Sequence, residues 1–278
     1  MSNVLVRKLS VKVTRDAYVQ KSHSPLPQIH RRFFMSKKIL LATMMLFAAA
    51  LAFSQTAAEL LKRIDENEIY TTIEYEGEMI IEYGNRRYVK VMKAWGRGNT
   101  DSFIEFTNPA DKGTKYLRTG GRLYVYSPDN EGVMLISGHM LKESMMGSDM
   151  SYEDTLNNET LASRYDPVIT GSEIVNGRDS WVLELKAKKK TESYPSRKLW
   201  IDKENGDLLR YELYALSGVK LKDYNLLRVE IINGRRFPVE GEMRDLMRKD
   251  SRTKFVMKNV VLDKPIADSV FSQRNLER

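Results

Sequence analysis

Few residues of this 278-residue chain could carry out chemistry. The chain has no cysteine, and His139 is its one histidine beyond residue 34. Most metal sites and activated nucleophiles use cysteine or histidine. A Ser-His-Asp arrangement would have to combine His139 with Ser137 or Ser144, in a Met-rich region without the Gly-x-Ser-x-Gly elbow of hydrolases. We therefore expect His139 to be an exposed or capping residue rather than a catalytic one.

Acidic side chains are the remaining candidates, because glycoside cleavage needs only two carboxylates. Asp149, Glu153 and Asp154 cluster in one short run and could form such a pair or bind a hard cation. The run lacks the alternating ligands and central glycine of a calcium loop, and helix capping explains most of it. The sequence also lacks a Walker-type loop and a dinucleotide fingerprint. We therefore expect no enzyme activity, cofactor or metal, and we rank a carboxylate-based hydrolase last.

Large apolar side chains are abundant by contrast. The candidates for an apolar cavity and its lid are Trp95, Phe103, Phe106, Leu117, Tyr124, Tyr126, Met140, Leu141, Met145, Met146, Trp181 and Trp200. Most of them would serve an ordinary core equally well. A broad sheet with few helices, however, leaves part of its concave face uncovered or hollow. A hollow apolar face with methionines in its lid suits a lipid-like ligand of variable shape.

A helix is predicted over residues 56–65. Thr56 and Glu59 have capping-box spacing, which marks a helix start. The apolar stripe consists of Leu60, Leu61 and Ile64. This helix should lie on an apolar surface.

Beyond the helix the period changes to two. Over residues 73–82, apolar residues alternate with glutamates, which is typical of a strand with one face in water. The acidic row could be a cation site, but such rows far more often form a solvated strand face.

Turn signals then recur between strand-like runs. They are Gly84-Asn85, Gly120-Gly121, Asn176-Gly177, Asn205-Gly206 and Asn233-Gly234. The runs span residues 88–95, 102–106, 122–126, 133–136, 180–185, 198–202, 208–214, 226–232, 238–245 and 253–262. The pattern predicts a large antiparallel meander of roughly ten or eleven strands.

One segment, residues 137–161, breaks this pattern and is rich in Met, Ser, Asp and Glu. Its apolar residues are spaced to form a short helix face, namely Met140, Leu141, Met145 and Met146. Ser151 and Asp154 offer a second helix start. Gly138 and Gly147 flank the first helix, either as hinges or as helix ends.

Residues 35–54 have the pattern of a cleavable secretory signal. Lys37 and Lys38 form its basic start, an apolar run follows over residues 39–53, and small residues frame a cut before Gln55. The apolar run is shorter than the roughly 20 residues of a membrane span, which favours cleavage over a retained anchor. We therefore expect an exported protein.

The basic excess of the chain lies in the part that this cut removes. The net charge is +8, but seven basic residues and one acidic residue precede Met35, and the signal adds two lysines. Residues 55–278 are then neutral, so the charge gives no reason to expect a nucleic-acid partner. Export does not need residues 1–34, and we interpret them as an over-extended gene start.

The remaining residues, 55–278, have a size that a single all-β domain commonly reaches. Without cysteine this domain can form no disulfide and carries no acyl-anchored residue at the signal cut. We therefore expect a soluble periplasmic protein that is not itself a lipoprotein and is stabilised by its core alone.

Several stretches resemble the outer-membrane lipoprotein-sorting-like family of bacterial envelope proteins. They are Phe106–Leu117, Leu123–Pro128, Ser144–Asp154 and Asp268–Phe271. The most specific motif consists of Gly147, Ser148, Asp149, Ser151, Tyr152, Glu153 and Asp154. The order of the elements is also similar to that of the LolA/LolB lipoprotein carriers, and the similarity covers residues 55–278.

This resemblance implies a mainly β (α+β) fold. A large antiparallel sheet would curl into an unclosed half-barrel, lidded by the N-terminal helix and a short Met-rich helical insertion. Carriers of this fold hold their lid with an arginine early in the sheet, and the sequence leaves open whether Arg86, Arg87 or Arg97 takes this place.

The resemblance further implies a periplasmic carrier that shelters lipoprotein acyl chains, or another lipid, in outer-membrane lipoprotein sorting. Its partners would be an inner-membrane transporter and an outer-membrane acceptor. The alternative is an envelope-stress sensor that binds lipid or an inner-membrane protein.

Overall fold

The computed structural model describes residues 57–277 except residues 68, 131 and 157–158. All of these belong to one structural unit. The predicted export signal, the stretch before it and the predicted cap Thr56 lie outside the described residues. Within them, the predicted first helix is confirmed and covers residues 57–67.

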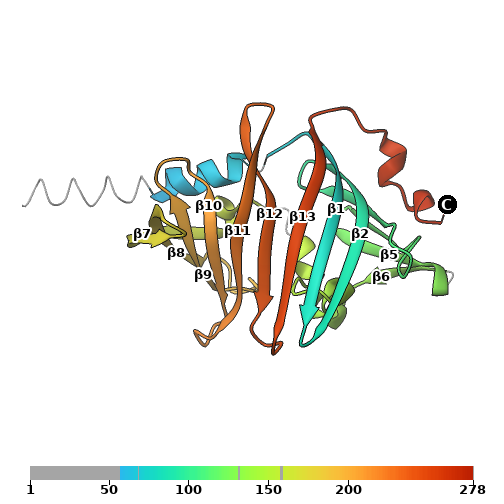
Figure 1. Cartoon of the computed structure of the whole chain (residues 1–278), viewed down its shortest axis with the longest axis horizontal. Helices are drawn as coiled ribbons and strands as arrows, with labels where there is room; N and C mark the ends of the chain where they lie inside the picture. The colour runs from blue at the N-terminus through green and yellow to red at the C-terminus, as the bar shows by residue number, and fades with distance from the viewer. Residues whose placement is uncertain (1–56, 68, 131, 157–158, 278) are drawn as a thin grey trace, which may run out of the picture. The chain divides into compact units, whose positions relative to one another are not determined.

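Thirteen strands form one antiparallel sheet with two free edges (Figure 1). The strands are β1 (Thr72–Tyr83), β2 (Arg86–Arg97), β3 (Asp101–Phe106), β4 (Lys115–Thr119), β5 (Arg122–Ser127), β6 (Gly132–Ile136), β7 (Tyr165–Val175), β8 (Arg178–Ala187), β9 (Ser196–Asp202), β10 (Leu208–Tyr214), β11 (Lys220–Ile232), β12 (Arg235–Asp245) and β13 (Ser251–Leu262). Their spatial order is β6-β5-β4-β3-β2-β1-β13-β12-β11-β10-β9-β8-β7. The chain therefore builds two meanders, and the pairing of β1 with β13 joins them into a sheet that does not close.

The tight turns follow the sequence signals. At Asn176-Gly177 both φ angles are positive, 50° and 78°, and at Asn233-Gly234 they are 50° and 76°. Two successive positive φ angles match the right-handed twist of the adjoining strands, and Asn-Gly reaches them at low cost. Both turns lie where the sequence predicted them, and they join β7 to β8 and β11 to β12.

Two strands, β4 and β7, were not predicted. β4 is short and carries the cations Lys115 and Arg118, which are both buried, so it shows no alternation of apolar and polar residues. β7 contains Pro167 and has a register shift at Gly171. A proline is tolerated there because β7 is an edge strand. These two strands account for most of the difference between the expected count and thirteen.

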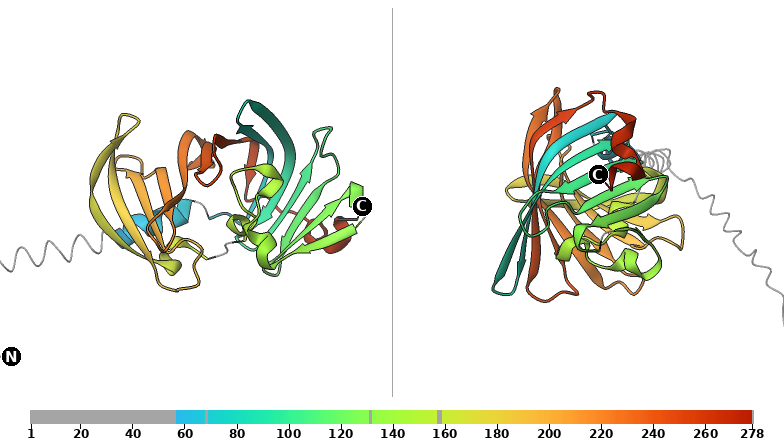
Figure 2. Two further views of the ribbon diagram at one scale, coloured as in Figure 1. Left: turned by 90° about the horizontal axis from the view of Figure 1, so that it is seen from below. Right: turned by 90° about the vertical axis from the view of Figure 1, so that its right-hand side faces the viewer.

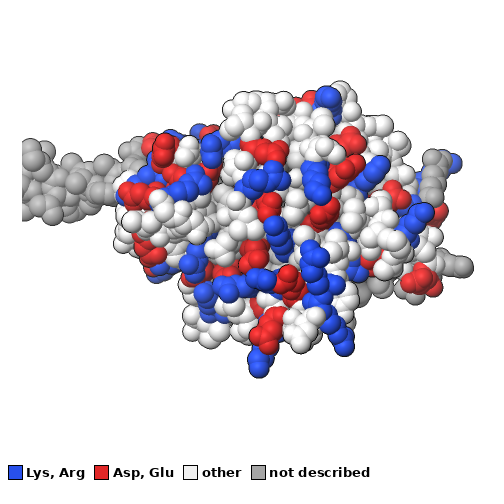
Figure 3. Space-filling model, viewed as in Figure 1, with Lys and Arg blue, Asp and Glu red and all other residues white. Residues whose placement is uncertain are grey.

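The acidic row of β1 is a solvated strand face, as predicted. Glu78 pairs with Lys258 and Glu82 with Arg252, both on the neighbouring β13. Figure 3 shows positive and negative side chains interspersed over the face of the sheet that it displays.

The sheet curves, and short elements lie against both of its faces (Figure 2). On the concave face the N-terminal helix packs on β8 and β9 through Leu60, Leu61 and Ile64. The Met-rich insertion packs on β1–β6 on the same face, with Met145 buried. On the opposite face the C-terminal segment, η5 (Asp268–Phe271) and η6 (Gln273–Asn275), covers β3 and β4.

The insertion consists of single helical turns rather than a helix with an apolar face. The turns are η2 (Gly138–Lys142), η3 (Met145–Gly147), η4 (Glu153–Thr155) and α2 (Leu161–Arg164). Gly138, Met146 and Gly147 have positive φ angles of 58°, 54° and 77°, and left-handed residues end a helix. The insertion is thus helical and short, as predicted, but its apolar residues Met140, Leu141, Met145 and Met146 are divided between two turns instead of sharing one helix face.

Candidate functional site

Between its two covers, the concave face of the sheet is hollowed by three adjoining cavities of about 230, 440 and 380 Å³. We call these three cavities together the groove. Met145 of the insertion borders the first cavity, of about 230 Å³. Ile64 of the N-terminal helix borders the third cavity, of about 380 Å³. Met257 of β13 lines all three. The groove therefore runs across the central strands from one cover to the other.

The floor of the groove is built from alternate residues of the central strands. In the first cavity the apolar lining includes Ile73, Met79, Met92, Ile104 and Phe255. In the third it includes Tyr211, Tyr224 and Leu226. Because side chains alternate along a strand, these residues share the concave face.

A glycine shapes this floor. The rings of Tyr211 and Tyr224 stack, with centroids 4.7 Å apart and planes 12° from parallel. The ring of Tyr224 lies over Gly241 of β12, and a Cβ at position 241 would overlap it. The absence of a side chain at Gly241 therefore lets the tyrosine lie flat along the sheet.

Polar groups gather at one side of the first cavity. Arg118 of β4 is nine-tenths buried and lines this cavity. Its guanidinium donates to the carbonyl of Thr155 in the insertion, at 2.6 Å, and to that of Asn99, at 2.7 Å. Burial lowers the pKa of Arg118. Burial, with a contribution from Tyr70, raises the pKa of Tyr75 in the same wall to about 12.

Arg118 on β4 thus ties the insertion to the sheet. Arg97, one of the three arginines considered from the sequence, pairs instead with Asp101 and Asp268, and its guanidinium lies 4.7 Å from the ring centre of Phe271. It therefore holds the C-terminal segment on the opposite face. Arg86 and Arg87 are exposed at the β1–β2 turn.

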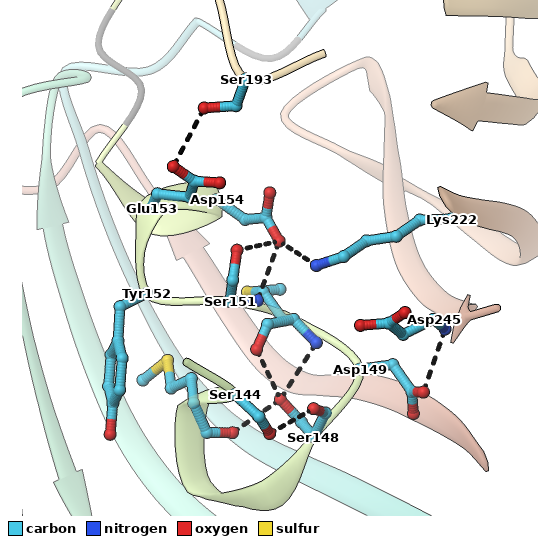
Figure 4. Close-up of polar contacts among 12 residues, drawn as sticks. Ser144, Ser148, Asp149, Ser151, Tyr152, Glu153, Asp154, Ser193, Lys222 and Asp245 are labelled. Carbon is cyan, nitrogen blue, oxygen red and sulfur yellow. Dashed lines mark hydrogen bonds and ion pairs between the residues drawn. The ribbon is translucent and has the colours of Figure 1, made fainter. Parts of the chain in front are cut away.

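Residues 147–154 of the insertion, which we call the clamp, fix it to strands β11, β12 and β13. Figure 4 shows the contacts with Lys222 and with Asp245. Asp149 is almost completely buried. It accepts hydrogen bonds from the backbone N–H of Asp245 at 3.0 Å and from the hydroxyl of Thr253 at 2.6 Å. Arg248 donates to the carbonyls of Gly147 and Ser148. Both oxygens of Asp149 are thus used to dock the insertion on β12 and β13.

Asp154 forms the second half of this clamp. Its carboxylate lies 2.7 Å from the ammonium of Lys222 on β11 and accepts the hydroxyl of Tyr194 at 2.8 Å. It also accepts both the backbone N–H and the hydroxyl of Ser151 (Figure 4). Burial by itself would raise the pKa of Asp154, but Lys222 and the hydrogen bonds hold it below its usual value. Glu153 accepts a hydrogen bond from the hydroxyl of Ser193.

The structure divides the predicted cavity residues between the two faces of the sheet. Those in the concave cluster under the insertion are Phe106, Met140, Leu141, Met145 and Met146. Trp181 packs near the N-terminal helix. Those packed on the opposite face with the C-terminal segment are Trp95, Phe103, Leu117, Tyr124 and Tyr126. Met145 and Trp95 border the first cavity.

Trp200 also lies on the opposite face, since its neighbours Leu199 and Ile201 pack toward the N-terminal helix. Its indole N–H donates to Glu173 at 2.7 Å, and the cations of Lys198 and Arg210 lie over its ring. It is a buried structural residue on the opposite face.

Sequence reasoning missed much of the groove floor, including Met79, Met92, Met150, Tyr224, Phe255 and Met257. The available signal was the period of two on β1. The same alternation, followed along the strands that flank β1, would have separated the residues on the concave face from those on the opposite face.

His139 is exposed, as predicted. Among the described residues, no group of three or more histidine, aspartate or glutamate side chains is placed to hold a metal ion. In the same part of the chain, no helix has the length and apolarity needed to cross a membrane.

An unclosed antiparallel sheet with covers on its concave face gives the chain a LolA-like fold. A family profile described as "Uncharacterized protein" matches residues 98–278, and the chain belongs to that family. No curated protein sequence matches the chain significantly.

Solved structures of other proteins share this fold, among them the following three. A DUF1329 family protein from Desulfovibrio piger is 28% identical with a TM-score of 0.73, covering 81% of this chain and 99% of its own. A candidate outer membrane lipoprotein-sorting protein domain from Vibrio parahaemolyticus is 20% identical with a TM-score of 0.71, covering 81% and 100%. A LolA superfamily protein from Nitrosomonas europaea is 19% identical with a TM-score of 0.65, covering 79% and 98%. The resemblance inferred from the sequence is thereby confirmed.

Proposed function

We propose that the chain is a carrier that shelters the acyl chains of lipoproteins, or of another lipid, in the groove, as a step of outer-membrane lipoprotein sorting. The observation that carries this proposal is the groove, which has an apolar floor and lies between two separate covers. The names of two proteins that share the fold, a lipoprotein-sorting domain and a LolA superfamily protein, support it.

Sheltering an acyl chain needs no directional chemistry. Each methylene that moves from water into an apolar site contributes about 0.8 kcal/mol. Methionine side chains adapt to ligands of different shape. Several of them line the groove, namely Met79, Met92, Met145, Met150 and Met257. We therefore assign binding rather than catalysis to this site.

Loading and release would require one cover to move. The insertion suits this role because it is made of single turns and is tied to the sheet at a few points, Arg118 and the clamp residues Asp149 and Asp154. A donor in the inner membrane and an acceptor in the outer membrane would each compete with the groove for the acyl chain.

The carrier role needs an exported protein, and we propose that residues 35–54 are removed before Gln55 and that residues 1–34 are not translated. Mass spectrometry of the protein from the cell envelope should find an N-terminus at Gln55. Peptides from residues 1–34 would contradict this reading of the gene start.

The carrier proposal is tested by the lipid that accompanies protein purified from the envelope. Met257→Asp places a carboxylate beside all three cavities at a half-buried position, and it should remove most of the solvent-extractable lipid detected by mass spectrometry. Met247→Asp, at an exposed position after β12, is the matched control and should retain it. Wild-type protein without lipid, or equal loss in both variants, would overturn the proposal.

A second candidate function is a regulatory module that binds an inner-membrane protein. Edge strand β6 favours it, because Val133, Met134 and Leu135 are all exposed there, and an edge of this kind can accept a strand from a partner. A photo-crosslinker at Met134 should then give one stable adduct with a membrane protein in cells. A carrier would give transient and diverse adducts instead.

A further inference from the structure

We propose, as an extension of the acyl-chain binding above, that the groove selects lipids whose head carries an oxyanion, a carboxylate or a phosphate, and that Arg118 binds this head. Arg118 lines the first cavity and is nine-tenths buried. Its Nε has no hydrogen-bond partner among the described residues. An oxyanion that reached this N–H would give it the acceptor that the described residues do not provide.

The charge of Arg118 also lacks a direct counterion within the described part of the chain. The partners of its two terminal nitrogens are the carbonyls of Thr155 and Asn99, which are neutral. The nearby carboxylate of Asp101 pairs with Arg97 and accepts a hydrogen bond from the hydroxyl of Thr119. A buried cation is normally paired, because removing a charge from water is costly.

Arg164 shows the usual arrangement in the same protein. It is as buried as Arg118, and it pairs with the carboxylate of Glu192. Arg236 and Arg244 likewise each pair with a buried aspartate, Asp207 and Asp223. Arg118 therefore differs from these arginines in facing a cavity without an acidic partner.

The surroundings of Arg118 fit an amphiphile with one such head. Ser102 and Thr155 line the same cavity and add polar groups beside the guanidinium. The apolar lining continues from there through Met92 and Met79 to Phe255. A ligand could thus place its head at Arg118 and its chain along the floor.

The test uses delipidated protein and three ligands that share a sixteen-carbon chain, hexadecanoate, hexadecyl phosphate and hexadecanol. A fluorescent acyl probe is first bound to the protein. Each ligand is then added at concentrations below those at which the ligand aggregates, and the displacement of the probe is measured. We expect the two anions to bind wild-type protein at least about tenfold more tightly than the alcohol, which corresponds to about 1.4 kcal/mol. The tighter of the two anions identifies the head as a fatty acid or a phosphate ester.

Arg118→Met should remove this preference and leave the alcohol bound. Since the change also frees the insertion, Arg248→Met serves as the matched control, because Arg248 holds the insertion without lining the groove. The control should keep the preference, and Arg118→Lys should keep part of it.

The outcomes separate this inference from the carrier proposal. If all three ligands bind wild-type protein equally, the assignment of Arg118 is overturned while the carrier proposal stands. The assignment is also overturned if Arg248→Met loses the preference as Arg118→Met does. If neither the probe nor any ligand binds, the carrier proposal itself is overturned.

Discussion

The ammonium of Lys222 lies 2.7 Å from the carboxylate of Asp154; the Lys222 side chain is buried and that of Asp154 is 12% exposed. This pair joins β11 to the insertion across 68 positions of sequence. Lys222→Met would leave a buried carboxylate without its cation, which typically costs about 3–5 kcal/mol of unfolding free energy. Chemical denaturation should show this loss. Adding Asp154→Asn should recover part of it, because the amide oxygen can still accept from Ser151 while the amide nitrogen donates to the hydroxyl oxygen of Tyr194; a double variant less stable than Lys222→Met would contradict the pairing.

The same carboxylate predicts a pH dependence. The pKa of Asp154 in the folded protein lies below its usual value near 3.8. A lowered folded pKa contributes stability that is fully present above the unfolded value and is lost as the pH falls through the folded pKa. The difference in melting temperature between wild type and Asp154→Asn should therefore be constant from pH 7 to about pH 5 and shrink below about pH 4. A difference that persists unchanged to pH 2 would refute this role.

Gly241 should tolerate no side chain beneath Tyr224. Gly241→Ala is expected to cost about 1–3 kcal/mol, because the methyl group forces the ring out of its place. The same substitution in a Tyr224→Ala background should cost much less, and a double-mutant cycle measures the difference. Gly171→Ala, at a strand glycine with open space around it, is the control and should be nearly neutral. Equal costs in both backgrounds would contradict the contact.

The C-terminal segment should stabilise the fold without contributing to the groove. Phe271 is buried on the opposite face under Arg97. Phe271→Ala is expected to cost about 3–5 kcal/mol, as large-to-small changes in a core do. The lipid bound per folded molecule should stay unchanged below the melting transition. Loss of lipid from folded Phe271→Ala protein would show that the two faces are coupled.

Much of the fold could be predicted from local pattern. The alternation of apolar and polar residues along β1 depends only on residues close in sequence, and it indicates a strand. The Asn-Gly pairs at 176 and 233 likewise indicate turns with positive φ angles. β4 escaped prediction because its buried cations, Lys115 and Arg118, donate hydrogen bonds to carbonyls distant in sequence, at Leu276 and at Thr155 and Asn99. No local pattern could indicate these partners.

The candidate site was harder to predict for two physical reasons. Adjacent strand residues such as Phe103 and Ile104 point to opposite faces, so a list of large apolar side chains mixes the groove with the outer packing. The acidic motif looked like helix capping, and Asp154 does accept the backbone N–H and the hydroxyl of Ser151, but Asp149 accepts the backbone N–H of Asp245 and thereby closes a contact over 96 positions. Such a contact appears only when the sheet is assembled.

Native mass spectrometry of the protein taken from the cell envelope tests the central claim most directly. We expect a mass of residues 55–278 with added lipid, and we expect this addition to be absent from Met257→Asp and present in Met247→Asp. A folded wild-type protein whose mass equals the chain alone, under conditions that preserve lipid adducts, would contradict the claim that the groove shelters acyl chains.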